Sequence, residues 1–265
     1  MPSGALRKLE TTGTDPVAYA LPLGAEAMPL AAFLGQTFRL DFEGEIRCLA
    51  CDRATRKSFG QGHCFRCFQR LARCDSCIVK PELCHYAAGT CREPAWGEAH
   101  CLIPHFVYLA NSSGLKVGIT RAHQATTRWI DQGASQALPI LRVPGRLESG
   151  LAEVALRAFV SDRTDWRAML RGEPEPVDLP AARDALLERF GPGGPALAGE
   201  RLPDAAPLRI RYPVLEYPKR LVSLGLEKTP LVEGTLLGVK GQYLLLDTGV
   251  FNVRKHAGHR VRVAE

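Results

Sequence analysis

Cysteine is missing from most of this chain. Residues 1–47 and 102–265 contain none, and all nine cysteines lie between Cys48 and Cys101. Cysteines that serve only as small apolar core residues scatter along a sequence, so a window this dense has another purpose. The dense window points to metal ligation or to disulfides.

A long apolar run is missing as well. The stretch from Leu21 to Leu34 is interrupted by Pro22, Glu26 and Pro29, and no apolar segment follows basic residues near the N-terminus. We therefore expect no signal peptide, no membrane-spanning helix and no membrane partner. Without an export signal we expect a cytoplasmic protein, and structural disulfides are rare in that reducing compartment.

Acidic residues are the minority among the charges. The chain has 34 Lys and Arg against 28 Asp and Glu, a formal net charge of +6. This balance is compatible with DNA or RNA as a partner without requiring one. With 46% hydrophobic residues in 265 positions, the chain can bury a substantial core and divide into two or three units.

Two C-x-x-C pairs open the cysteine window. Twelve residues separate the pair Cys48 and Cys51 from the pair Cys64 and Cys67. A C-x-x-C turn aims two thiolates at one point about 2.3 Å from each sulfur, and two such turns complete a tetrahedron around zinc. Gly60 and Gly62 lie where the chain must turn into the second pair. The spacing predicts a structural zinc site rather than disulfides or a redox pair.

The other five cysteines allow several ligand sets. We expect a second structural zinc on Cys74, Cys77, Cys84 and Cys91, because one further C-x-x-C pair needs only two more ligands. The residues that can substitute as ligands are His85, Cys101 and His105. If Cys101 is left free, it is either a buried or ligand-positioning residue or a nucleophile whose pKa nearby cations depress.

The segments around the cysteines predict simple elements. Residues 1–34 show no periodicity and predict a flexible arm. Thr37–Phe42 alternates polar and apolar residues, as a strand does, and Glu43–Glu45 predicts a turn. Together these patterns indicate a zinc ribbon, in which a hairpin presents the cysteines at its tip.

A hairpin and two helices are expected after the cysteines. His105–Ala110 and Leu115–Thr120 predict paired strands around an Asn-Ser-Ser-Gly turn. Arg121–Asp131 predicts a helix that Gly133 ends. Ser149 predicts the cap of a second helix, whose apolar stripe comprises Leu151, Val154, Ala155, Ala158 and Phe159.

These residues resemble two known families. A tyrosine, a Lys-Val-Gly-Ile-Thr strand, an arginine and a glutamate on a later helix occur in the order typical of GIY-YIG nucleases, in the branch where lysine replaces the second tyrosine. The longer runs CLAC, GTCREPAWGE, VYLANSSGLKVGITR, RWIDQGA and EGTLLGVKGQYLLLDTGVFNVRK are similar to a prokaryotic family catalogued as a domain of unknown function, family 2797. The second resemblance implies no activity.

The GIY-YIG resemblance implies a catalytic set. Tyr108 would take part in proton transfer from the attacking water, Arg128 would contact the phosphate, and Glu153 would hold one Mg or Mn ion. Lys116 would pair with a phosphate as a point charge. The alternative to these catalytic roles is purely structural: Tyr108 is an ordinary strand residue, and Glu153 forms a surface ion pair with Arg157.

Two tryptophans lie among polar residues nearby. Trp129 stands beside Arg128, Asp131 and Gln132, and Trp166 follows a polar run that starts at Asp162. Each tryptophan could stack on a nucleobase while its neighbours read the base edge. We expect the commoner role, in which the ring anchors a core.

The C-terminal part changes character. A Pro- and Gly-rich connector contains one helix near Ala181–Phe190, and its GPGGP segment is the best domain boundary. Short strands punctuated by glycine then predict a small β-barrel. From Leu208 onward there are ten Lys and Arg against five Asp and Glu, which suits a nucleic-acid partner.

The sequence as a whole predicts an α+β protein with an N-terminal zinc-ribbon lobe, a central GIY-YIG-like α/β domain and a C-terminal small β-barrel. The expected function is that of a zinc-binding protein associated with DNA or RNA, whose GIY-YIG-like central domain hydrolyses phosphodiester bonds with a divalent metal. The alternatives are a small-molecule enzyme with a reactive Cys101–His105–Tyr108 pocket and a non-catalytic binding module. The expected segments are 1–34 (arm), 35–101 (zinc lobe), 102–172 (GIY-YIG-like), 173–206 (connector) and 207–265 (barrel).

Overall fold

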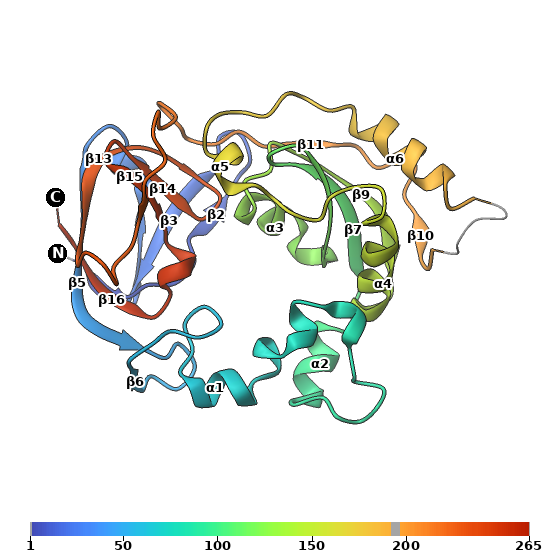
Figure 1. The fold of residues 1–265 in the computed structure, drawn as a ribbon, viewed down its shortest axis with the longest axis horizontal. Coiled ribbons are helices and arrows are strands. Elements are labelled where there is room, and N and C mark those ends of the chain that lie inside the picture. The colour runs from blue at the N-terminus through green and yellow to red at the C-terminus, as the bar shows by residue number, and fades with distance from the viewer. Residues whose placement is uncertain (1, 192–196, 265) are drawn as a thin grey trace. The chain divides into compact units, whose positions relative to one another are not determined.

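The computed structural model describes residues 2–191 and 197–264. It is a mixed α+β fold with three sheets (Figure 1). The chain divides into two compact units. Unit 1 comprises Met1–Arg70, Leu170–Gly172 and Ile210–Glu265, and unit 2 comprises Leu71–Met169 and Glu173–Arg209. None of the helices in the described ranges combines the length and the apolar character that crossing a bilayer needs.

Unit 1 is built on one eight-stranded sheet. Its strands run in the order β1-β16-β5-β13-β14-β15-β12, with β6 paired to β5. Within the described residues β1 and β12 end this path and do not pair, so the predicted closed C-terminal barrel is wrong. The cause is β5, which lies between β16 and β13 and joins the C-terminal strands to the N-terminal half. The bounds are β1 (Ser3–Ala5), β5 (Thr37–Arg47), β6 (Ala54–Thr55), β12 (Ser223–Leu224), β13 (Leu231–Lys240), β14 (Tyr243–Leu246), β15 (Gly249–Asn252) and β16 (His259–Ala264).

The first 34 residues are structured, which corrects the predicted flexible arm. β1 pairs with β16 at the edge of the large sheet. The strands β2 (Glu10–Thr12), β3 (Ala18–Leu23) and β4 (Glu26–Pro29) form a three-stranded antiparallel sheet. Leu6, Leu9 and Leu21 are fully buried, so scattered leucines anchor this segment although their spacing follows no long period.

The expected turn at Glu43–Glu45 is absorbed into β5. The strand starts where predicted, at Thr37, but continues to Arg47. Gly44 has a φ of 77°, and the register against β16 shifts between His259 and Val261. The three residues therefore form a bulge that bends the strand toward the cysteines without ending it.

Unit 2 has a five-stranded antiparallel sheet. β7 (His105–Asn111) and β8 (Leu115–Arg121) form the predicted hairpin, in which Tyr108 faces Gly118 across the strands. β9 (Gln136–Val143) pairs with the other edge of β7 and also with β10 (Glu200–Arg201) and β11 (Leu208–Arg209). The helices of unit 2 are α2 (Pro94–His100), α3 (Ala125–Asp131), α4 (Arg146–Leu156), α5 (Trp166–Met169) and α6 (Leu179–Glu188).

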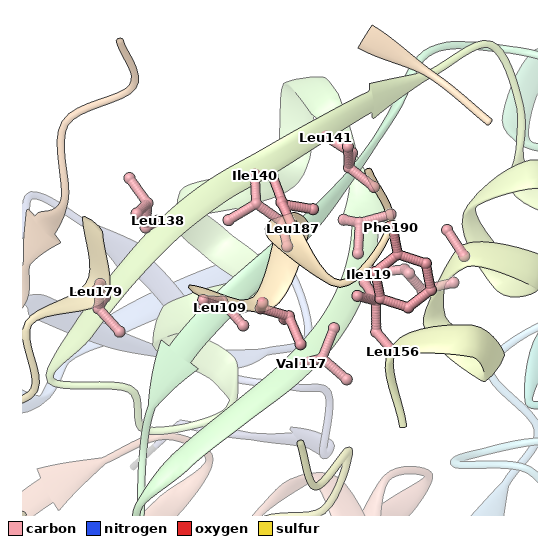
Figure 2. Close-up of a cluster of buried hydrophobic side chains, with 13 residues drawn as sticks. Leu109, Val117, Ile119, Leu138, Ile140, Leu141, Leu156, Leu179, Leu187 and Phe190 are labelled. Carbon is pink, nitrogen blue, oxygen red and sulfur yellow. The ribbon is translucent and has the colours of Figure 1, made fainter. Parts of the chain in front are cut away.

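The core of unit 2 explains why the predicted connector belongs to it. The expected helix in 173–206 is α6, and its Leu179 and Leu187 pack with Leu138 and Ile140 of β9 (Figure 2). Phe190, just after α6, joins the same cluster. The segment is therefore part of a packed layer rather than a spacer. The boundary predicted at GPGGP falls largely on 192–196, outside the described residues.

Helix α4 turns a different face to the core from the one predicted. It begins at Arg146, and Ser149 lies inside it instead of capping it. The predicted stripe is largely exposed, with Leu151 at 53% and Phe159 at 50%. Small residues face inward instead, because a Cβ at Gly150 would lie only 2.6 Å from the backbone nitrogen of Glu82. Close backbone packing, rather than bulky side chains, sets the orientation of this helix.

The cysteine window is divided between the two units, so the single lobe predicted at 35–101 is not one body. Cys48 to Cys67 belong to unit 1, and the rest of the window, residues 71–101, belongs to unit 2. The second part consists of three short 3-10 turns followed by α2, namely η2 (Ala72–Cys74), η3 (Ser76–Ile78) and η4 (Pro81–Leu83).

Gly238→Ala should destabilise unit 1. A Cβ at this position would lie 2.8 Å from Cα of Val214 and 3.0 Å from the carbonyl oxygen of Pro213, and backbone atoms cannot move aside cheaply. We expect a loss of about 1–3 kcal/mol in the free energy of unfolding, measured by chemical denaturation. The control is Gly172→Ala, where nothing lies within 4 Å of the added methyl group. Equal stability of the two variants would contradict this packing.

Candidate functional site

The first four cysteines form one cluster in unit 1. The Sγ atoms of Cys48, Cys51, Cys64 and Cys67 all lie within 4.8 Å of one another, and Cys51 and Cys64 are 3.8 Å apart. A tetrahedral zinc with bonds of 2.3 Å places its sulfurs about 3.8 Å apart. The four thiols therefore fit a structural metal ion such as zinc.

Two glycine-dependent turns bring these thiols together. The first pair follows β5, whose end pairs with β6. Gly60 and Gly62 have φ of 49° and 110°, as the predicted turn into the second pair requires. A Cβ at Gly62 would lie 2.6 Å from the Leu49 side chain, so the two turns pack against each other. The second pair lies at the start of α1 (Phe65–Arg70), with Cys64 just before the helix and Cys67 inside it.

Backbone dipoles favour a thiolate in this cluster. Burial raises the pKa of Cys48, but backbone N–H groups of the two turns, chiefly that of Cys64, outweigh it and lower the pKa to about 6. Metal ions bind the thiolate form of cysteine, so these N–H groups prepare the site for a cation.

Four of the five remaining cysteines line a separate small cavity in unit 2. Cys77, Cys84 and Cys91 line it, as predicted partners would, and so does Cys101. Within the described part of the chain, Cys74 is not among the lining residues, although we expected it to be a ligand. His85 lines the cavity, whereas His105 is buried in β7 with Nδ1 2.7 Å from the carbonyl oxygen of Ile103.

A buried tyrosine organises the other predicted site. Tyr108 is fully buried, and a Cβ at its cross-strand partner Gly118 would lie 2.6 Å from the phenol oxygen. The Gln132 amide is 2.7 Å from this hydroxyl. In the orientation that satisfies both neighbours, its nitrogen faces the phenol and its oxygen accepts from Arg128 at 3.0 Å. Burial raises the pKa of Tyr108 and Arg128 opposes the rise.

Lys116 is a buried cation beside this tyrosine. Only 3% of its surface is exposed, and Nζ donates a hydrogen bond to Thr164 Oγ1 at 3.1 Å. Burial and the neighbouring Arg128 lower the pKa of Lys116 to about 8, while Glu153 and Asp162 act in the opposite direction. The ammonium group is thus charged at neutral pH but holds its proton weakly.

Glu153 is half-buried and interacts electrostatically with the groups of the same site. Burial raises its pKa, and so does the nearby carboxylate of Asp162, whereas Arg157, Arg128 and Lys116 lower it. Asp162 also accepts a hydrogen bond from Arg157 at 3.1 Å. The carboxylate therefore lies within electrostatic reach of both predicted cations, at the edge of the buried face of α4.

Polar residues beside the two tryptophans make contacts that the sequence did not predict. Trp129 is 5% exposed and packs edge-on against Tyr108, with ring centroids 5.8 Å apart, so it is an anchor as expected. Gln132 positions Tyr108 and Arg128, and Asp162 approaches Glu153. In the sequence Gln132 and Asp162 are recognisable only as polar residues close to a tryptophan, and nothing there predicts the groups that they contact.

A second titratable group, in unit 1, was not anticipated. His256 and His259 are buried, and Glu227 Oε2 lies 3.2 Å from Nε2 of His256. Glu227 and His259 also line a surface pocket of about 540 Å³ beneath the bulge of β5. Both histidines lie in the basic segment that begins at Leu208.

The unit 2 site combines two cations with two carboxylates around a buried phenol. Lys116 and Arg128 can bind a phosphate, and Glu153 with Asp162 can supply oxygen ligands to Mg or Mn. All of these residues come from β7, β8, α3, α4 and the segment after α4. The pKa of Lys116 and the pKa of Glu153 each respond to the charge of the other group and to that of Arg128.

One of the comparisons with known proteins identifies a family. A sequence profile for the family described as protein of unknown function (DUF2797) matches residues 35–261. Searches among curated proteins and among solved structures gave no match. The matched range includes every cysteine and the whole charged site of unit 2, and the chain belongs to the DUF2797 family.

Proposed function

We propose that this protein binds nucleic acid and hydrolyses its phosphodiester bonds in unit 2 with the help of a divalent metal. The observation that carries the proposal is the gathering of Lys116, Arg128, Glu153 and Asp162 beside Tyr108. A hairpin, an arginine-bearing helix and a later glutamate-bearing helix also follow one another as the GIY-YIG resemblance implies.

The two cations account for substrate binding. The Arg128 guanidinium is held by the Gln132 amide and retains donors that can bind a phosphate in a forked geometry. Lys116 adds a point charge in a site of low polarity, where each interaction is stronger than in water. A phosphodiester between them would meet opposite charge on two sides.

In this proposal the carboxylates of Glu153 and Asp162 bind the divalent metal. Mg and Mn prefer oxygen ligands, keep several waters and need few protein groups, which Glu153 and Asp162 supply. A bound ion would neutralise the charge that develops on the phosphorus centre. Because Asp162 raises the pKa of Glu153, a cation between the two would relieve their repulsion.

Tyr108 acts as a positioning residue in this proposal. It is fully buried and its pKa is raised, so it keeps its proton and has no open path to an attacking water. Its hydroxyl instead orients Gln132 and, through it, Arg128. This differs from the proton-transfer role that the resemblance implies.

The proposed substrate is DNA or RNA. The net charge of +6 favours a polyanion, and release of counterions from the phosphates would drive binding. The cluster of Cys48, Cys51, Cys64 and Cys67 holds a structural zinc in this proposal, which supports the end of β5 without taking part in chemistry.

The small-molecule alternative finds no support in the contacts. Burial raises the pKa of Cys101, which makes it a poor nucleophile. Burial lowers the pKa of His105 to about 4, and Tyr108 is enclosed by Trp129 and Gln132. Three buried and separately engaged groups do not form a reactive pocket.

Glu153→Gln should abolish hydrolysis while leaving nucleic-acid binding intact. The amide keeps the size of the side chain but removes a metal ligand, and we expect cleavage to fall by about 10²–10³-fold. The assay measures cleavage of single- and double-stranded DNA and RNA with Mg or Mn, and binding by fluorescence anisotropy.

The matched control is Glu188→Gln, an exposed carboxylate near the end of α6. It should cleave as the unmodified protein does. If the unmodified protein binds these substrates but cleaves none of them with either metal, the protein is a binding module and the hydrolase proposal is wrong.

The rate of cleavage should show a bell-shaped pH dependence. Burial and Arg128 lower the pKa of Lys116 to about 8, so the cation that binds phosphate is lost as the pH rises past this value. Burial and Asp162 raise the pKa of Glu153, so metal binding improves as the pH rises from the acidic side. We expect kcat/KM to fall about tenfold per pH unit above the Lys116 pKa.

Lys116→Arg tests the basic limb, because a guanidinium stays charged throughout this range. Its activity should no longer decline above about pH 8 even if the maximum is lower. An unchanged decline in this variant would assign the limb to another group.

Cys51→Ser should remove the zinc of unit 1. Three thiolates cannot complete the tetrahedron, so we expect about one zinc per chain to be lost and the segment 48–67 to become sensitive to protease. Metal content by mass spectrometry and limited proteolysis measure the two effects. Cys74→Ser serves as the control and should keep this zinc; full metal content in Cys51→Ser would contradict the site.

A further inference from the structure

The segment that carries the first four cysteines is strongly basic. Residues 48–70 of unit 1 contain five Lys and Arg and a single acidic residue, Asp52. Asp52 is already paired, since its Oδ2 lies 3.1 Å from Nη1 of Arg47. A zinc ion with four thiolates would add a charge of about −2, so the segment stays positive with the metal bound.

The five cations are open to solvent and lack acidic partners. On the neighbouring strand β5, Arg39 and Arg47 pair with carboxylates at 2.9 and 3.0 Å. By contrast, five exposed side chains form no ion pair within the described part of the chain, namely Arg53, Arg56, Lys57, Arg66 and Arg70. Charges that no carboxylate neutralises can bind an external polyanion.

An aromatic side chain is exposed among these charges. Phe65 is 53% exposed although it is large and apolar. Its ring centroid lies 5.4 Å from that of Phe59, which is in turn 6.0 Å from that of Phe68. Nζ of Lys57 lies 5.4 Å from the centroid of the Phe59 ring. Other rings therefore support Phe65 from one side, while much of its own ring stays accessible to a ligand.

The C-terminal part of unit 1 adds a further cation beside this segment. A hydrogen bond of 2.6 Å from Arg254 Nε to Gln61 Oε1 joins the cysteine loop to η6 (Arg254–His256). The exposed Lys255 lies on η6 and forms no ion pair with any described carboxylate. We call these six unpaired cations, together with Phe65, the basic surface.

A single-stranded nucleic acid matches the chemistry of the basic surface. Its phosphates are negatively charged, and its unpaired bases offer flat faces that stack on aromatic rings. A duplex keeps those faces inside its own stack. An anionic membrane would attract the same cations, but Phe65 is the one large apolar side chain of residues 48–70 that is strongly exposed. A single ring gives little insertion into a bilayer.

We propose that the basic surface of unit 1 binds a single strand of DNA or RNA, with one base stacked on Phe65 and phosphates paired with the surrounding cations. The proposal rests on the proposed binding of nucleic acid and adds a site to it, since the hydrolytic residues belong to unit 2. The Cys48–Cys67 cluster holds the chain on both sides of the loop. The ring and the cations are thereby ordered before a strand arrives, which lowers the entropy cost of binding.

The test measures binding of a fluorescent single strand of roughly 16 nucleotides to the full chain, by anisotropy without added Mg or Mn. Arg66→Gln combined with Arg70→Gln should weaken binding about tenfold. It should also reduce the slope of log affinity against log salt by about 1.4, because each phosphate contact on a single strand contributes about 0.7. The matched control combines Lys219→Gln with Arg220→Gln, two exposed cations that precede β12, and should bind as the unmodified protein does.

Phe65 provides a second measurement that charge alone would not affect. Phe65→Ala should weaken binding of the single strand about 5–100-fold without changing the salt slope, because it removes stacking and no charge. Phe65→Trp keeps an aromatic ring at this position and should restore the affinity. DNA and RNA strands of the same sequence then show which of the two the surface prefers.

The outcomes separate this proposal from the proposed hydrolysis. If the unmodified protein binds the strand but Phe65→Ala and the double arginine variant bind equally well, the basic surface is overturned and hydrolysis in unit 2 is not. If the unmodified protein binds no oligonucleotide, both are overturned. Binding to anionic phospholipid vesicles in place of the oligonucleotide would identify a membrane-binding surface and overturn the proposal.

Discussion

The charged site of unit 2 depends on the stacking of the Tyr108 ring across Gly118. These residues are cross-strand partners in the hairpin, and the ring occupies the space that any side chain at 118 would need. With the ring lying flat on the strand, its hydroxyl meets Gln132 and its edge meets Trp129. Helix α3, which carries Arg128, thereby packs against the sheet through Trp129 and the adjoining Gln132.

Burial then determines the chemistry of the charges that this packing assembles. Desolvation lowers the pKa of Lys116 and raises that of Glu153, while each group favours the charged form of the other. Such opposed shifts are typical of sites in which groups are arranged for binding or catalysis. The cysteine-rich turns also help to hold α4 in place. The turn η4 packs against Gly150 of α4, the helix that carries Glu153.

The sequence analysis succeeded where a signal is local. The C-x-x-C spacing predicted the Cys48–Cys67 cluster, and alternation with an Asn-Ser-Ser-Gly turn predicted the β7–β8 hairpin. It failed where partners are distant. The barrel was wrong because β5 takes the C-terminal strands into a shared sheet, and the arm was wrong because β1 pairs with a strand more than 250 residues away. Nothing in the local sequence of either segment encodes that partner.

The sequence by itself determined which residues can ligate a metal or bind a phosphate. Thiols, ammonium groups and carboxylates have these properties wherever they lie in a fold. Their grouping was decided by the tertiary structure. It placed Cys101 with Cys77, Cys84 and Cys91 around the second cavity, and it brought the hydroxyl of Tyr108 against the Gln132 amide. The physical reason is that close backbone contacts at glycines, which no periodicity reveals, set the angles at which helices and turns meet.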